Sequence, residues 1–463
     1  MKTVILALLS FSLFVMPGLS QPDTGAMVNR IFKEALTHQV AFENLRGLTG
    51  KCPGRISGTP AAAAAVEYTR QLLEALNPDT VWLQVVEVPH WIRGRQEKGM
   101  ILSAKFGQMK VPVTALGTTP GTGPEGISAP VIEVSSPDEI RELGKTKIEG
   151  KIVFFNRPMD PELFNTFAAY GRAAGQRTRG PAIAARYGAV AAVVRSLTTR
   201  LDDIPHTGVS HFDEMEKKIP AVAVSTLGAE KLHRILRNDP DTRFYMFTGC
   251  RNAAPVKSFN VVGEIRGTTF PEQIITVGGH LDAWDTGEGA HDDGAGCVQA
   301  IEMIRIFRKL GIRPKHTIRA VMFMDEEIAQ SGGKVYAAEA LRKGEKHVLA
   351  MESDRGGFLP RGFGIGASDP ELFSQFMSLK PYFSPWGINE FARGGGGTDI
   401  GPLRQQGTIL ISLVPDPQRY FDVHHSAADV FEAVNPRELE LGAAAITSLI
   451  WLADQMDFSG QTK

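Results

Sequence analysis

The sequence predicts an α/β protein with a mostly parallel sheet that is flanked by helices and interrupted by an inserted β-rich domain. Apolar strand-like runs alternate with amphipathic helix-like runs from residue 258 onward, which is typical of βαβ units. A different texture precedes them, with short apolar runs between turn-rich polar loops. The chain ends in a long amphipathic helical pattern. The simplest plan is one α/β domain built from both ends of the chain around an insert.

The individual elements of the main domain follow from periodicity and from turn residues. A helical pattern covers 25–76 with a break at "CPGRISGTP", and "TVWLQVVEVPHW" at 80–91 is typical of a strand. Later strands are expected at 273–280, 317–324 and 347–354, and helices at 296–310, 332–343 and 437–454. The main domain is therefore predicted to comprise 21–115 and 251–463.

The insert is predicted at 116–250, where "GTTPGTGPEGISAP" forms a turn-rich entry. Short strands are expected at 129–134, 150–155, 188–196 and 219–225. Its histidines, His206, His211 and His233, are isolated from one another, and the insert shows no cluster of acids and histidines. We therefore expect a compact, β-rich unit that supplies no metal ligand.

The first residues have the pattern of a secretory signal peptide, predicted at 1–20. Lys2 precedes an apolar run from Val4 to Met16, and small residues follow near Gly18. This run is too short to span a membrane, and no later stretch is long and apolar enough to do so. The sequence therefore predicts an exported protein, periplasmic or extracellular, with no membrane span after cleavage.

The chain contains three cysteines, Cys52, Cys250 and Cys297, and none forms a CxxC pair. Cys297 lies on an apolar helical pattern, which is typical of a buried free thiol. An exported protein can form disulfides, so we expect a bond between Cys52 and Cys250.

Acidic and imidazole side chains recur directly after the expected strands of the main domain. After "ITVGG" come His280 and Asp282, after "RAVMFM" come Asp325, Glu326 and Glu327, and after "VLAME" come Ser353 and Asp354. A Gly-rich loop contains Asp292 and Asp293. Near the end of the chain, "YFDVHHSAAD" contains His424, His425 and Asp429. Ligands of open α/β sheets bind at the carboxyl ends of the strands, so we expect these groups to form one cluster. Such a cluster of carboxylates would repel itself unless a cation lay among them.

The donor set indicates zinc or another divalent transition metal, because imidazole and carboxylate ligands are mixed. One catalytic zinc needs about three protein ligands and an open position, whereas this sequence offers more donors and a spare acid. The surplus favours two metals that share one carboxylate. Adjacent residues on an extended segment point to opposite sides, so one of Glu326 and Glu327 can face a metal while the other faces the substrate.

Five motifs, in this order, carry a resemblance to a known family: "GGHLDAWDTGEGAHDDGAG", "MDEEIAQSGG", "ESDRG", "GGGGTDIGPL" and "HHSAAD". With them the chain resembles the M28 family of dinuclear zinc exopeptidases and, within it, the carboxypeptidase Q-like (plasma glutamate carboxypeptidase-like) group. The resemblance covers essentially the whole mature chain, because the insert is similar to the protease-associated (PA) domain of some members.

The resemblance implies a role for each matching residue. One zinc would be held by His280, Asp292 and Asp354, and the other by Asp292, Glu327 and His425. Asp282 would support His280, and Glu326 would be the general base. Asp399 would lie behind the ligands. His425 is chosen over His424 because the family's ligand directly precedes Ser or Thr. The similarity also implies a cis peptide after Asp292 and a hydroxide held between the two metals.

The implied activity is hydrolysis of dipeptides or short peptides with free termini. Arg355, Arg393 and Arg404 lie near the motifs and are candidates to bind a substrate carboxylate. Two alternatives stay open: an aminopeptidase of the same family that acts on longer peptides, and a catalytically silent binding protein. A serine hydrolase is disfavoured because no GxSxG motif is present. A net charge of −1 gives no electrostatic case for nucleic acid, and a homodimer stays open.

Overall fold

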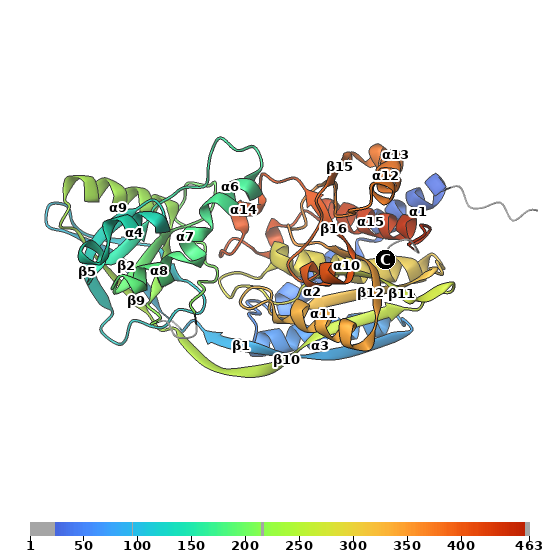
Figure 1. The fold of residues 1–463 in the computed structure, drawn as a ribbon, viewed down its shortest axis with the longest axis horizontal. Helices are drawn as coiled ribbons and strands as arrows, with labels where there is room; N and C mark the ends of the chain where they lie inside the picture. The colour runs from blue at the N-terminus through green and yellow to red at the C-terminus, as the bar shows by residue number, and fades with distance from the viewer. Residues whose placement is uncertain (1–23, 95, 214–216, 459–463) are drawn as a thin grey trace, which may run out of the picture.

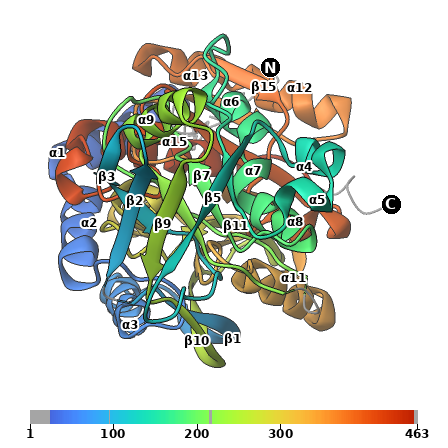
Figure 2. The ribbon, with the colours of Figure 1, turned by 90° about the vertical axis from the view of Figure 1, so that its left-hand side faces the viewer.

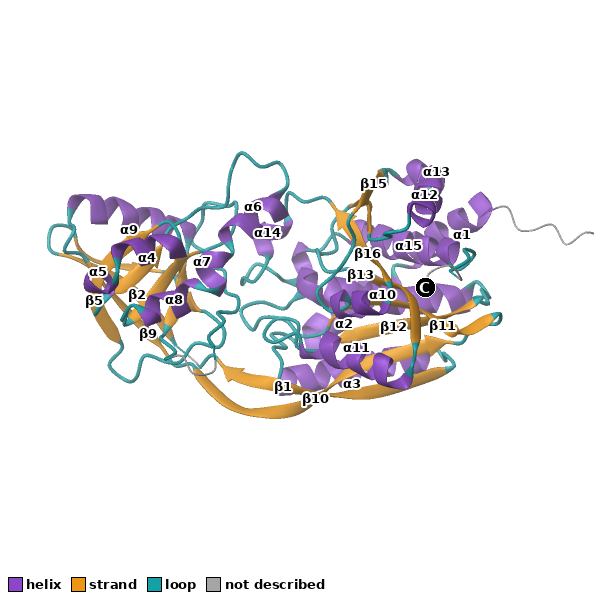
Figure 3. Ribbon diagram, in the orientation of Figure 1, coloured by secondary structure: helices purple, strands orange, loops and turns teal. Residues whose placement is uncertain are grey.

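A computed structural model describes residues 24–94, 96–213 and 217–458. These residues form two eight-stranded sheets, each in its own unit, with helices packed on both (Figure 1; Figure 3). The expected signal peptide at 1–20 lies outside the described residues. Within the described part of the chain, no helix has the length and apolar character needed to cross a membrane.

The main sheet has a parallel centre, which is joined to the strands on each side by an antiparallel pair. Strands expected at 273–280, 317–324 and 347–354 are present as β11, β12 and β13, and they pair in parallel. In spatial order the strands are β1 (Thr80–Ile92), β10 (Arg251–Ile265), β12 (His316–Phe323), β11 (Phe270–His280), β13 (Lys346–Glu352), β16 (Ile409–Pro415), β14 (Pro360–Ile365) and β15 (Glu390–Arg393). Because β12, β11, β13 and β16 run in parallel, their carboxyl ends meet at one edge.

Helices cover both faces of the main sheet. One face packs against α1, α3, α10 and α15, and the other packs against α11 and the turn η3. The final helix begins where Asn435 accepts hydrogen bonds from two backbone N–H groups and Pro436 fits the first turn. The elements are α1 (Thr24–His38), α2 (Val40–Lys51), α3 (Pro60–Ala75), α10 (Ala295–Lys309), α11 (Ser331–Lys343), α12 (Pro370–Ser378), α13 (Lys380–Phe383), α14 (Tyr420–Val423), α15 (Pro436–Ala453), and the short turns η1 (Ala290–Gly294), η2 (Ser384–Trp386), η3 (Gly401–Gln406) and η4 (Phe431–Ala433).

The second sheet starts earlier in the chain than the predicted insert boundary at residue 116. Its strands β2, β3 and β4 all precede that residue, because the hairpin β2–β3 pairs with β9 and β4 pairs with β8. Helices also flank this sheet, so the β-rich insert is itself an α/β unit (Figure 2). Its elements are β2 (Glu97–Ser103), β3 (Gly107–Val111), β4 (Val113–Ala115), β5 (Ile127–Val134), β6 (Ile152–Phe155), β7 (Ala191–Arg195), β8 (Ala221–Val224), β9 (Arg243–Thr248), α4 (Pro137–Leu143), α5 (Lys145–Ile148), α6 (Thr166–Ala173), α7 (Gly175–Thr178), α8 (Gly180–Arg186) and α9 (Thr226–Asn238).

A two-stranded ribbon connects the units. The chain enters the insert through β1 and leaves it through β10, and these two strands pair antiparallel along their length. In Figure 3 they run as one long ribbon below the main domain and lead across to the insert. Contacts between α6 of the insert and α14 of the main domain join the units a second time, through Phe167 against Tyr420 and Phe421.

The cysteine expectation is wrong. Cys52, Cys250 and Cys297 are all free and buried, so Cys52 and Cys250 do not form the expected disulfide. The two residues belong to different apolar clusters, Cys52 beneath α3 and Cys250 beside Trp91 and Trp284. Counting cysteines cannot detect such a separation, because it is set by the tertiary fold.

We expect thiol titration of denatured, unreduced protein to yield three free thiols per chain, because all three cysteines are unbonded. The protein would be denatured in the presence of the reagent, since burial shields each thiol in the native state. A value of one thiol per chain would contradict this result and restore the disulfide.

Candidate metal centre

The ends of three parallel strands bring most of the predicted residues together. β11 ends at His280, β12 ends just before the acidic segment 325–327, and β13 ends just before Asp354. Asp292 enters from η1, and His425 follows α14. All five predicted metal ligands and Glu326 therefore lie at one edge of the main sheet.

Asp292 lies at the centre of this group. Its Oδ1 is 3.2 Å from His280 Nε2, and its Oδ2 is 3.2 Å from His425 Nε2. Asp354 completes the first group, with Oδ1 3.3 Å from His280 Nε2. Glu327 completes the second, with Oε2 3.0 Å from His425 Nε2. The two oxygens of one carboxylate thus face two separate sets of donors, and the peptide bond after Asp292 is cis, as the resemblance implies.

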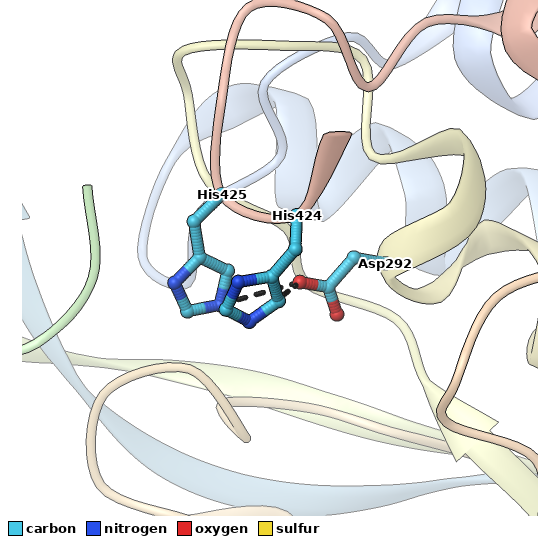
Figure 4. A group of neighbouring side chains, drawn as sticks. All are labelled: Asp292, His424 and His425. Atoms are coloured by element: carbon cyan, nitrogen blue, oxygen red, sulfur yellow. Dashed lines mark ion pairs between the residues drawn. The ribbon is translucent and has the colours of Figure 1, made fainter. Parts of the chain in front are cut away.

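His424 also approaches Asp292. Its imidazole stacks on that of His425 with ring centroids 3.5 Å apart, and its Nε2 is 3.8 Å from Asp292 Oδ2 (Figure 4). His425 is closer to Asp292 and also reaches Glu327, whereas no ion pair joins His424 to Glu327 among the described residues. His425 is thus the nearer of the two imidazoles to both carboxylates, while Asp292, His424 and His425 together form one group that could hold a metal ion.

The electrostatics of the centre call for a cation. Burial, together with neighbouring carboxylates, raises the pKa of Glu326 and of Asp293 well above the usual range. Burial opposes protonation of His280, but Asp354 and Asp292 outweigh it and raise the His280 pKa well above its usual value. Within the described residues, Glu327 Oε1 has no hydrogen-bond partner although it is buried. A divalent cation would satisfy these groups, so the donor set fits zinc.

Asp282 is placed differently from what its implied role suggests. His280 Nδ1 donates to the backbone carbonyl of Asp282 at 3.0 Å, while the Asp282 carboxylate lies 3.9 Å away. The carboxylate accepts backbone N–H groups of Asp325, Glu326 and Glu327 instead. Asp282 therefore orients the imidazole with its main chain and the two glutamates with its side chain.

Several supporting residues carried no assignment from the sequence. Asp429 accepts the backbone N–H groups of His291 and Asp292, and Asp293 accepts those of His280 and Gly296. Buried Arg55 donates to the carbonyls of Leu281, Glu288 and Gly289. Glu352 accepts from the backbone of Thr398, Asp399 and Ile400, so the predicted Asp399 lies behind the ligands, buried next to Glu352. Asp293 of "HDDG" and Asp429 of "HHSAAD" lie in the motifs, so the sequence could have indicated them. Arg55 gave no such signal, because it lies by itself in a turn-rich stretch.

An open pocket of about 660 Å³ lies in front of the centre. Both units line it, with Phe167, Tyr170, Arg177, Thr178, Val209 and His211 from the insert and Asp292, Glu326, Glu327, Asp354, Arg355, Gly394–Gly397, Tyr420, His424 and His425 from the main domain. Of the predicted carboxylate-binding arginines, Arg355 lies on the wall. Arg393 packs over Phe373, and Arg404 donates to Gly395 O. The candidate metal clusters among the described residues contain no insert residue.

We expect Asp282→Asn to lower the free energy of unfolding by about 1–3 kcal/mol, because the one amide oxygen can still accept from Asp325 and Glu326 while the N–H₂ is left facing the N–H group of Glu327. Asp79→Asn is the matched control. Asp79 also accepts a backbone N–H, from Arg266, but lies on an exposed surface, so its loss should matter less. Equal stability changes in the two variants, measured by denaturant unfolding, would contradict the assigned role.

Comparison with known proteins agrees with this geometry. Residues 260–450 match Peptidase family M28. Carboxypeptidase Q of Bos taurus is 34% identical over 406 residues, which cover 87% of this chain and 83% of that protein. A Peptidase M28 precursor from Shewanella amazonensis superposes with a TM-score of 0.89 at 29% identity, covering 94% of this chain and 97% of that one. The fold also matches BSAP, a zinc aminopeptidase from Bacillus subtilis, at a TM-score of 0.64 and 17% identity over 90% and 96% of the two chains.

The long match to carboxypeptidase Q and the agreement in fold over nearly the whole chain identify a metallopeptidase. The family match lies within the main domain and contains His280, Asp292, Glu326, Glu327, Asp354 and His425. The chain belongs to peptidase family M28.

Proposed function

We propose that this protein is an exported exopeptidase that uses two zinc ions to hydrolyse dipeptides or short peptides with free termini. The observation that carries the proposal is the position of Asp292, whose two oxygens each face an imidazole from a different donor group. His280 and Asp354 would hold one ion with Asp292, and Glu327 and His425 would hold the other. Export is supported by the apolar run from Val4 to Met16 after Lys2.

When bound, such ions would polarise the scissile carbonyl and lower the pKa of an attacking water. The carboxylate of Glu326 lies on the pocket wall next to Glu327, where it would accept the proton of that water and pass it to the leaving amine. Asp282 fixes the backbone of both glutamates, so the base and the neighbouring ligand keep their relative positions.

The pocket wall favours a substrate carboxylate. Arg355 packs over Phe167 with its guanidinium carbon 5.0 Å from the ring centroid, and it lines the pocket. Arg177 is 5% exposed, and among the described residues no Asp or Glu pairs with it. Two cations near the centre would attract the free carboxylate of a short peptide. This supports a carboxypeptidase or dipeptidase activity over that of an aminopeptidase on longer chains.

We expect Glu326→Gln and Glu327→Gln to differ in metal content. The wild type should carry two zinc ions per chain, and Glu326→Gln should keep both while turnover falls by about 10²- to 10⁴-fold, because only the proton acceptor is lost. Glu327→Gln should lose zinc, since a neutral amide is a much poorer ligand than a carboxylate. Elemental analysis and a dipeptide assay measure both. Near-normal turnover in Glu326→Gln would overturn the mechanism.

We expect dipeptides with a free C-terminus to be cleaved faster than their C-amides, and Arg355→Met to reduce kcat/KM for the free acid by about 10- to 100-fold. Arg393→Met is the control, because Arg393 packs on Phe373 away from the pocket. The amide should be insensitive to both substitutions. If blocking the N-terminus abolishes cleavage while C-amidation has no effect, the aminopeptidase alternative is correct.

A further inference from the structure

We infer that the insert positions one half of the metal centre, because its segment His206–Thr207 holds the loop that carries His425. This inference rests on the metal centre proposed above and deepens it. Although the insert provides none of the proposed ligands, it contacts the backbone and the imidazole of one of them. His206 and Thr207 are therefore proposed as positioning residues.

Two hydrogen bonds tie this segment to the main chain of the histidine pair. His206 Nδ1 donates to His424 O at 2.7 Å, and Thr207 N–H donates to His425 O at 2.8 Å. Both insert residues are buried, with exposed fractions of 2% and 0%. The two consecutive carbonyls of the ligand loop are thus held by two consecutive residues of the other unit.

The backbone at His425 needs such support. Its φ is 58°, in the left-handed region that residues other than glycine rarely adopt. Neither α14, which ends at Val423, nor the short turn η4, which begins at Phe431, holds this residue within regular structure. One bond within the loop, from Ser426 N–H to Val423 O, spans this residue, and the bond from Thr207 holds its own carbonyl from outside.

A third contact reaches the imidazole itself. Thr207 O lies 3.4 Å from His425 Nδ1 and also accepts from Arg177 Nη1 at 3.2 Å. A carbonyl oxygen has two lone pairs, so it can accept both. Arg177 Nη1 also lies 3.3 Å from His425 Nδ1 itself. The insert thus places a carbonyl and a guanidinium against Nδ1, which limits rotation of the imidazole while its Nε2 faces Asp292 and Glu327.

Hydrogen bonds within the insert fix the segment His206–Thr207. His206 N–H donates to Ser196 Oγ at 2.9 Å, and Thr207 Oγ1 donates to Ala115 O at 2.7 Å. The chain of contacts therefore runs from the second sheet, through His206 and Thr207, to His425. The positions of His280 and Asp354 do not depend on the insert, because these residues lie at the ends of strands of the main sheet.

The test is zinc binding to full-length protein, with His206→Leu removing the donor and His206→Asn restoring one near the position of Nδ1. Zinc affinity is measured by competition with a chelator at defined free zinc. His206→Leu should keep one ion at wild-type affinity and bind the second about 10- to 100-fold more weakly. His206→Asn should recover most of that affinity. His233→Leu, a histidine of the insert that pairs with Glu133 instead, should match the wild type.

Unchanged affinity for both ions in His206→Leu would overturn the inference, as would equal weakening of both ions or a failure of His206→Asn to recover affinity. If His206→Leu does not fold, Ser196→Ala removes the acceptor of the His206 N–H and should also weaken one ion selectively; unchanged affinity there would overturn the inference. The proposed function is tested separately, by the zinc content and the peptidase activity of the wild type. A wild type with two ions but no peptidase activity would reject that function and leave the positioning role intact.

Discussion

The buried negative charge around Asp292 is the constraint on which the rest of the centre depends. Asp292, Asp293 and Glu327 lie close together with little exposed surface, and such groups cannot all be ionised without compensation. The protein supplies part of it, through backbone N–H groups that reach Asp293 and through imidazoles that flank Asp292. The rest of the compensation would come from a bound cation. Without metal, the protein is therefore expected to carry protons on some of these groups instead.

The same constraint explains the glycines around the centre. Asp293 accepts N–H groups from both β11 and α10, so these two elements must approach its carboxylate closely. A Cβ at Gly279 or at Gly296 would collide with the Asp293 carboxyl group. The first glycine lies in the strand and the second at the helix start, and both are needed at these positions for the acid to join the two elements. Two glycines of the motif are thus a consequence of packing around one carboxylate.

The sequence made the strand ends predictable, because parallel strands place their carboxyl ends at one edge and His280, Glu327 and Asp354 each follow such a strand. The βαβ alternation predicted the main sheet for the same local reason. Contacts set by tertiary structure could not be inferred from a local pattern. The Asp282 carboxylate turns toward the 325–327 backbone, Arg55 reaches three distant carbonyls, and the cysteines lie in separate clusters. The start of the second sheet at Glu97 was missed because β2, which carries β3 on its other side, pairs with β9, far along the chain.

The two halves of the centre differ in how they are held. His280 and Asp354 are placed by neighbouring strands of one sheet, whose ladder of backbone hydrogen bonds limits their relative movement. His425 lies on an irregular loop between the two units, and the opposite wall of the pocket belongs to the insert. A displacement of the insert would therefore change the second half of the centre and the shape of the substrate pocket together, while the first half stayed with the sheet. Residues of both units line the pocket, so the contacts that shape this pocket also act on the histidine beside it. The insert thereby has a physical role in an enzyme whose proposed ligands all come from the other unit.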